Sequence, residues 1–213
     1  MYTDSEGIII KQIKISGGRR MIVLLSEKYG LISAGTSIPE KGKNKSSLAL
    51  RPFTRGRYEL YKGRENFNIN GAEVIQSYYS IGEDIDRYMA ASYILELTEK
   101  MLPEDESMPG MYKLLRDFLE LLAERKSEFE TPVIAYQIKA LSMQGLSLSQ
   151  NPLLINESDD KINIVKYIES HSMSGLKGLS IAENIRSSLE AYIKQYIYDN
   201  LGIGNLKSEM FRI

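Results

Sequence analysis

The spacing of apolar residues changes from a two-residue period to a 3.6-residue period near residue 80. Before that point, segments rich in β-branched residues alternate with glycine-containing turns, which is typical of strands. We expect strands over residues 7–15, 20–26, 30–36, 57–62 and 66–79. Ser80 and Glu83 then have the spacing of a capping box in front of the first helical stripe. The pattern predicts an α+β protein, with a β domain at 1–80 and an all-helical domain at 81–213.

The order of the predicted strands favours a small barrel. The first three strands follow one another through short turns, and the last two form a hairpin after the longer connection 36–57. A five-stranded OB-type barrel has this order, and such barrels often bind single-stranded nucleic acid. An SH3-like barrel or an open sheet is the alternative, because counting strands does not separate these folds. Gly71, inside the last predicted strand, indicates a bulge or a bend.

Apolar stripes at helical spacing indicate about five helices in the second domain. We expect them over 83–102, 109–122, 131–145, 159–170 and 180–202. Residues 146–157 are rich in serine, asparagine and proline and predict a long loop.

The net charge of −1 hides a strong asymmetry between the two parts. Residues 1–67 contain 13 basic and 6 acidic side chains, whereas residues 68–213 contain 14 and 22. Such a division suggests that the first part faces an anion such as nucleic acid. The connection 36–57 carries six basic residues against the single acid Glu40: Lys41, Lys43, Lys45, Arg51, Arg55 and Arg57.

The candidate nucleic-acid-binding residues are these six together with Arg19 and Arg20, which flank the first predicted hairpin. Lysine and arginine side chains bind phosphates and release counterions from the nucleic acid. Tyr61 shares a strand face with Glu59, so we expect it to be exposed and to stack on a base. The neighbouring aromatic residues Phe53, Tyr58 and Phe67 are expected to pack in the core.

The residues that most enzymes and metal sites require are scarce. The chain has no cysteine, and its one histidine, His171, lies in a stretch rich in serine and glycine. The glycine-rich stretch at Gly17 does not have the spacing of a phosphate-binding loop. We therefore expect no catalytic residue, no metal ligand and no cofactor. With no apolar stretch that could span a membrane and no leader pattern, we expect a cytoplasmic protein that does not bind membranes.

Several short stretches, in this order and spacing, carry a resemblance to one family. They are EGIIIK (6–11), RMIVLLSEKYGLISA (20–34), Lys45-Ser46, Arg51-Pro52-Phe53 leading to YELYKG (58–63), AEVIQSYYSI (72–81), SYILELTEKMLPE (92–104) and LGIGNLKS (201–208). The chain resembles the bacterial recombination mediator RecO family of the RecF pathway of DNA repair.

The resemblance implies an N-terminal OB domain and a C-terminal helical domain. It also implies binding of single- and double-stranded DNA, annealing of complementary strands, and action with RecR to help RecA displace single-strand-binding protein. Many members carry a four-cysteine zinc module, roughly where residues 146–180 lie in this chain. This chain has no cysteine, so the zinc module is not part of the expectation.

Two other functions remain open from the residues alone. In the first, the helical domain acts as an adaptor for partner proteins, and contact with nucleic acid is incidental. In the second, the barrel is an RNA-binding OB domain that acts outside DNA repair.

We expect the purified protein to contain no stoichiometric zinc, because a tetrahedral zinc site without cysteine would need carboxylates for most of its ligands. Elemental analysis before and after treatment with EDTA checks this, together with the thermal unfolding curve. Zinc at one equivalent, lost together with the folded structure, would contradict it.

Overall fold

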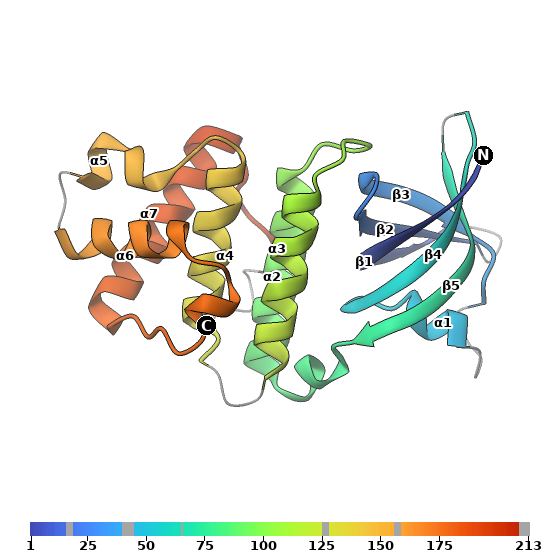
Figure 1. The fold of residues 1–213 in the computed structure, drawn as a ribbon, viewed down its shortest axis with the longest axis horizontal. Helices are drawn as coiled ribbons and strands as arrows, with labels where there is room; N and C mark the ends of the chain where they lie inside the picture. Colours follow the sequence, from blue (N-terminus) through green and yellow to red (C-terminus); the bar gives the residue numbers. More distant parts are fainter. Residues whose placement is uncertain (16–18, 40–44, 65, 125–127, 156–158, 209–213) are drawn as a thin grey trace.

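The computed structural model describes residues 1–15, 19–39, 45–64, 66–124, 128–155 and 159–208. A β-barrel and a set of helices lie side by side along the longest axis, with two helices between the barrel and the others (Figure 1). No helix in the described part of the chain is both long and apolar enough to cross a membrane.

The barrel is closed by strands in the order β1-β2-β3-β5-β4. The strands are β1 (Tyr2–Lys14), β2 (Arg20–Ser26), β3 (Gly30–Thr36), β4 (Thr54–Lys62) and β5 (Phe67–Ser77). The long strand β1 pairs with β2 through its second half and with β4 through its first half. A short parallel pairing between β3 and β5 completes the circle. The predicted OB-type order is confirmed, and the open sheet is excluded.

The barrel interior is filled by apolar side chains that alternate with outward-facing residues. Tyr58 and Phe67 are buried there, as predicted, whereas Phe53 is half-buried and packs edge-on against Tyr88. The short helix α1 (Lys45–Ala49) was not expected within the irregular connection. It packs under the barrel, because Ala49 and Leu50 are buried in the barrel core and the Tyr58 hydroxyl donates to the Ala49 carbonyl at 2.8 Å.

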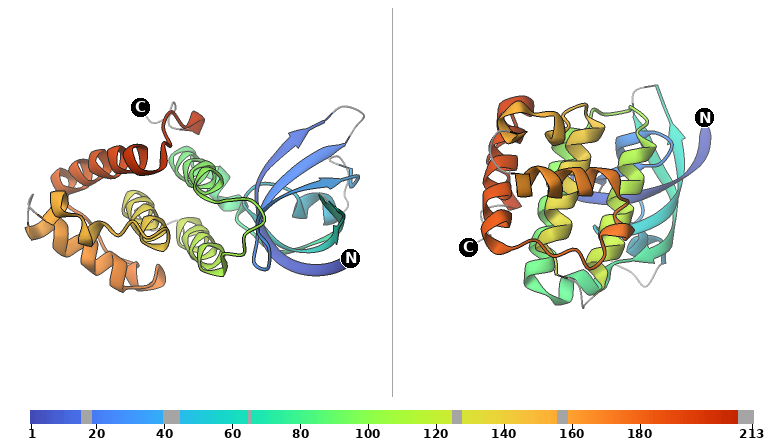
Figure 2. Two further views of the ribbon diagram at one scale, coloured as in Figure 1. Left: turned by 90° about the horizontal axis from the view of Figure 1, so that it is seen from above. Right: turned by 60° about the vertical axis from the view of Figure 1, so that its left-hand side comes forward.

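The helical part is built around one helix that is buried on almost all sides, as expected of a helix that is apolar all round. This helix is α4 (Glu130–Met143), which lies behind the pair α2 (Ile85–Met101) and α3 (Pro109–Ala123). Two further helices, α6 (Asp159–Ser170) and α7 (Glu183–Leu201), cover its other side (Figure 2). The remaining elements are single turns: η2 (Tyr79–Glu83), η3 (Leu148–Gln150), α5 (Pro152–Ile155) and η4 (Ser174–Leu176).

The predicted capping box at Ser80 and Glu83 is wrong. These residues lie in the 3₁₀ turn η2, and α2 begins only after Asp84. The Asp84 carboxylate accepts hydrogen bonds from the backbone N–H groups of Asp86 at 3.0 Å and Arg87 at 3.2 Å. An aspartate is as good an N-cap as a serine, and Asp84 stands directly before the helix. At the other end of the helical part, Gly202 ends α7 in the left-handed conformation, as predicted.

The barrel and the helices share one hydrophobic core. The outward side chains of Ile8, Ile10, Val23, Leu25 and Leu31 are buried in the same cluster as the residues of α2 and α3. The helices therefore cover the outer face of β1, β2 and the start of β3.

The connection between α2 and α3 extends this contact along the edge of β3. The N–H of Asp105 donates to the Leu31 carbonyl at 2.9 Å, and Ser33 donates to a Glu104 carboxylate oxygen at 3.0 Å. Gly30 has a φ of +70°, and a Cβ atom there would lie 1.7 Å from the Glu106 carbonyl oxygen. Only glycine allows this close approach.

A polar cluster also joins the barrel to the helices. Arg55 of β4 donates to the Glu6 carboxylate of β1 at 2.9 and 3.2 Å, and the Tyr112 hydroxyl of α3 donates to the same oxygen at 3.2 Å. Burial alone would raise the pKa of Glu6, but the hydrogen bonds and the charge of Arg55, helped by Tyr112, hold this pKa below its ordinary value. The cluster is therefore more stable when Glu6 is ionised than when it is protonated.

We expect residues 1–79 on their own to fold, but to self-associate, because the fragment exposes the apolar face that the helices cover. Circular dichroism and analytical ultracentrifugation of the fragment check this. Replacing Val23 and Leu25 by threonine in the fragment should restore a monomer, since threonine keeps the strand preference. A random-coil spectrum, while the whole chain is folded, would contradict a barrel that folds independently.

We expect Glu6→Gln to lower the free energy of unfolding at pH 7 by about 1 kcal/mol, which is less than a buried hydrogen bond to a charged group contributes, because the site is partly exposed. The pKa of Glu6 is depressed in the folded state. The stabilisation that ionised Glu6 provides is therefore complete above its ordinary pKa, and it is lost as the pH falls through the folded-state pKa. Urea unfolding at pH values between 7 and 3 measures this. The difference in unfolding free energy between the Glu6→Gln variant and the unchanged protein should shrink as the pH falls. Glu59→Gln, on the exposed face of β4, is the control, and an equal effect of both changes would contradict the role of the cluster.

Candidate nucleic-acid interface

The strand register places five outward-facing residues in one row around the end of the barrel that lies away from the helices. Tyr2 of β1 lies opposite Tyr61 of β4, and Tyr61 lies opposite Asn68 of β5. Asn68 in turn lies opposite Gly35 of β3, which lies opposite Met21 of β2. We call Tyr2, Tyr61, Asn68, Gly35 and Met21 the end row.

The end row forms the floor of a hollow of about 630 Å³, which we call the end hollow. It lies between the β1–β2 and β4–β5 connections. Its other lining residues are Ile15, Arg19, Arg20, Thr36, Ser37, Asn66, Phe67, Ile69 and Asn70. None of these described lining residues is acidic, so the hollow does not repel an anion.

Two tyrosines stand at one side of the end hollow. The ring centroids of Tyr2 and Tyr61 are 5.0 Å apart with an angle of 53° between the ring planes. Tyr61 is 38% exposed, as predicted from its strand face, and Tyr2 is 72% exposed. Two exposed aromatic rings that lie together in a hollow can bind a ligand, and stacking on a base is one such use.

Arg19 and Arg20 both line the end hollow, but Arg19 is exposed and Arg20 is buried. The Arg19 side chain is exposed. Arg20 is only 4% exposed, and its guanidinium donates to the Gln12 side-chain oxygen at 2.8 Å and to the Ile38 carbonyl at 2.5 Å. Gln12 in turn donates to the Leu50 carbonyl. Arg20 therefore holds the chain after β3 and the α1 region against the barrel, and only Arg19 offers an exposed charge.

The structure disperses the other predicted basic residues. Arg55 lies in the polar cluster with Glu6, and Arg57 is exposed one step further along the same face of β4. Arg51 is exposed at a second hollow of about 610 Å³ near α1, where Leu48 and Tyr79 are also exposed.

The three predicted lysines belong to the connection after β3. This connection leaves the barrel at the rim of the end hollow, which Ser37 lines. Lys41 and Lys43 lie outside the described residues, and Lys45 begins α1. Of the predicted site residues, the described structure brings only Arg19, Arg20 and Tyr61 together.

Sequence reasoning missed Tyr2 and the three asparagines Asn66, Asn68 and Asn70. Tyr2 was missed because β1 begins five residues before the predicted strand, where its first half pairs with β4. The asparagines carry a signal that could have found them. They alternate with Phe67 and Ile69, and in a strand with a buried apolar face the alternating polar residues point outward.

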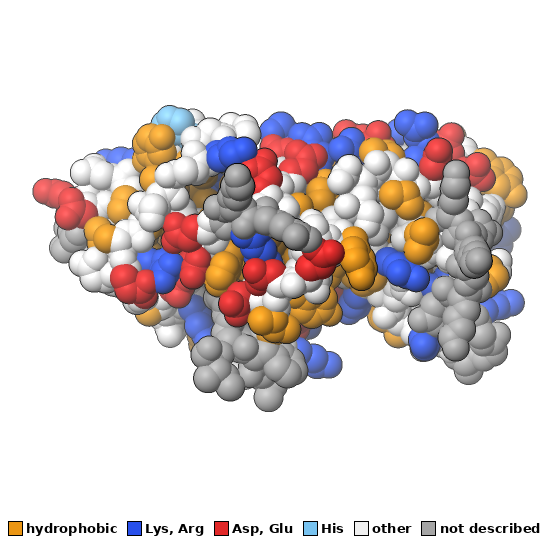
Figure 3. Space-filling model, turned by 90° about the horizontal axis from the view of Figure 1, so that it is seen from below, with side chains coloured by type: hydrophobic (Ala, Val, Ile, Leu, Met, Phe, Trp, Pro, Cys, Tyr) orange, Lys and Arg blue, Asp and Glu red, His pale blue; other side chains and the backbone are white. Residues whose placement is uncertain are grey.

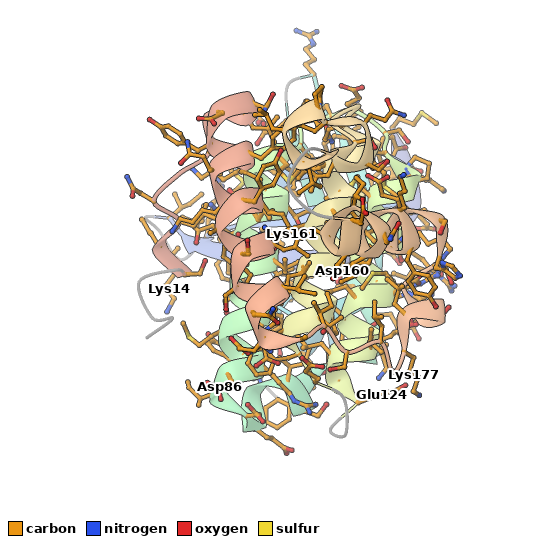
Figure 4. The ribbon with its side chains drawn as sticks, turned by 90° about the vertical axis from the view of Figure 1, so that its left-hand side faces the viewer. Lys14, Asp86, Glu124, Asp160, Lys161 and Lys177 are labelled. Carbon is orange, nitrogen blue, oxygen red and sulfur yellow. The ribbon has the colours of Figure 1, made fainter. Side chains whose placement is uncertain are left out.

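The charge distribution agrees only partly with the expected basic surface. On the face in Figure 3, acidic side chains lie mostly over the helical part, and basic ones are scattered. Within the helical part, Lys177 pairs with Glu124, at the end of α3, at 2.6 Å (Figure 4). Among the described residues, no three His, Cys, Asp or Glu side chains come together in a way that could hold a metal ion.

Comparison with known proteins agrees with the fold. The family model for the N-terminal part of recombination protein O matches residues 1–78, and the model for its C-terminal part matches residues 82–151. The DNA repair protein RecO of Alkaliphilus metalliredigens is 25% identical over 98% of this chain and 97% of that protein. RecO of Clostridium acetobutylicum is 26% identical over 98% and 88%, and RecO of Oceanobacillus iheyensis is 30% identical over 69% and 57%. The chain belongs to the RecO family and has a role in DNA repair and recombination.

Proposed function

We propose that this protein binds single-stranded DNA across the end hollow and anneals complementary strands. The observation that carries the proposal is a hollow whose described lining has no acidic side chain and includes the exposed Tyr61 and Arg19. Aromatic rings take up bases of any sequence, and arginine and lysine side chains bind the phosphates between them.

The helices that cover the outer face of the barrel support the placement of single-stranded DNA in the end hollow. Because α2 and α3 bury Val23, Leu25 and Leu31, the centre of the β1-β2-β3 face is closed to a ligand. The end of the barrel stays open, and the 36–57 connection, whose sequence contains three lysines, leaves the barrel at the rim of the end hollow, where Ser37 lies. Annealing brings two polyanions together, and cations beside the bound strand reduce the repulsion between them.

The family relationship extends the proposal to partners. In this extension the protein also binds double-stranded DNA, acts with RecR, and helps RecA to displace single-strand-binding protein. Family membership and the shared two-part organisation support it. No catalytic step by this chain is part of the proposal.

One observation favours the adaptor function as a second candidate. The second hollow, near α1, is lined by Leu48, Phe53, Tyr79 and Tyr88, and Tyr79 is 73% exposed. Apolar side chains gathered in an exposed hollow are a common feature of protein-binding surfaces. In this alternative, the basic residues have no role in binding partners.

We expect binding of a single-stranded oligonucleotide to weaken with salt with a log-log slope of about −3.5, from about five phosphate contacts. These contacts would come from Arg19, Lys41, Lys43, Lys45 and one of Arg51 and Arg57. Changing Lys41, Lys43 and Lys45 together to alanine should make the slope shallower by about 2, and should weaken all sequences alike. Fluorescence anisotropy at several salt concentrations measures this.

The control is alanine at Lys161, Lys166 and Lys194, which removes the same charge from α6 and α7 at the far end of the molecule (Figures 1 and 4). It should leave the slope unchanged. The first triple variant should also anneal complementary strands more slowly, with an unchanged urea midpoint. If that variant keeps the affinity and slope of the unchanged protein, the DNA-binding proposal is wrong. Partner binding that survives the same change would then favour the adaptor function.

A further inference from the structure

We propose that the end hollow holds an unpaired nucleobase, which stacks on Tyr61 and pairs through its edge with the side-chain amide of Asn68. This inference rests on the proposed function and specifies what part of the DNA the hollow recognises. It assigns a base-binding role to Asn68 and a positioning role to Gly35.

The amide of Asn68 is available for a ligand. Its side chain points outward from β5 and makes no hydrogen bond with any residue that the structure describes. It lies against the backbone of Gly35, because a Cβ atom at Gly35 would be 3.0 Å from the Asn68 side-chain oxygen. A carboxamide offers both donors and acceptors, as the edge of a base does.

Tyr61 lies directly beside this amide, since Tyr61 and Asn68 face each other across the β4–β5 pair. Its neighbour Tyr2 is tilted by 53°, so the two rings do not cover each other face to face. An aromatic face next to a carboxamide can hold a base by stacking while the amide pairs with its edge.

The chemistry of the hollow selects an unpaired base over a paired one. In a duplex, the faces of a base are covered by its neighbours and its pairing edge is occupied. The end hollow, at about 630 Å³, has the size of a small-ligand pocket, and the described lining contains no acid that would repel the neighbouring phosphates. The amides of Asn66 and Asn70 lie in the same lining and can pair with a second base or a sugar.

The test compares a natural single strand with a strand of equal length and charge that contains abasic sites. We expect the natural strand to bind about tenfold more tightly, because stacking contributes to binding in addition to the phosphate contacts. Tyr61→Ala and Asn68→Ala should each weaken binding of the natural strand, Tyr61→Ala by about tenfold. Neither change should alter binding of the abasic strand, binding of a blunt duplex, or the salt slope.

Two conservative variants separate base contact from folding. Tyr61→Phe keeps the ring and should bind the natural strand as the unchanged protein does. Gly35→Ala should reproduce the loss seen with Asn68→Ala, because its methyl group displaces the amide. Tyr198→Ala, which changes an exposed tyrosine of α7 far from the end hollow, is the control.

Equal binding of the natural and abasic strands would overturn the base site while leaving the phosphate contacts of the proposed function intact. A loss of duplex binding equal to the loss of single-strand binding in Tyr61→Ala would overturn it too. If no single strand binds at all, both the proposed function and the base site fail.

Discussion

The apolar contact between the barrel and the helices determines which part of the barrel is available. Ile8, Val23 and Leu25 point out of the barrel, yet they are buried in the same core as α2 and α3. Each such side chain contributes roughly 1.5–3 kcal/mol when it is fully buried. This contact therefore holds the two parts in a fixed relation and closes the outer face that an isolated barrel would present. A ligand of the barrel is left with the surfaces outside this contact, and the end hollow is one of them.

The basic residues of the barrel divide into a group that is hydrogen-bonded within the protein and a group that is exposed to solvent. Arg20 and Arg55 lie where the chain has to be held together, beside the α1 region and beside the helices, and each is hydrogen-bonded within the protein. Composition and spacing do not distinguish them from Arg19 or Arg57, which are exposed. A count of basic residues thus overstates the charge that a nucleic acid would meet.

The order of the strands could be predicted because each strand has its own local pattern of alternation and its own turn. Features that depend on closure of the barrel could not. The first residues of β1 are a strand because they pair with the end of β4, and the start of β4 pairs with Gly7 and Ile8. Likewise, α1 is held by the contact of Ala49 with Tyr58. The start of α2 was misplaced for a local reason, since Ser80 and Asp84 both have cap chemistry and only the structure shows which one is used.

The bulge predicted at Gly71 decides the chemistry of the end hollow. Glu59 lies opposite Gly71, but the next residue of β4, Leu60, lies opposite Ile69, so Asn70 has no partner. Before the bulge the inward residues of β5 are Phe67 and Ile69, and beyond it they are Ala72 and Val74, so the inward set shifts from odd to even positions. A regular strand in the register of Ala72 and Val74 would turn Asn68 into the barrel core and expose Phe67 and Ile69, because side chains alternate with a period of two. The extra residue therefore lets both halves of β5 bury their apolar side chains, and it is the reason that amides line the end hollow.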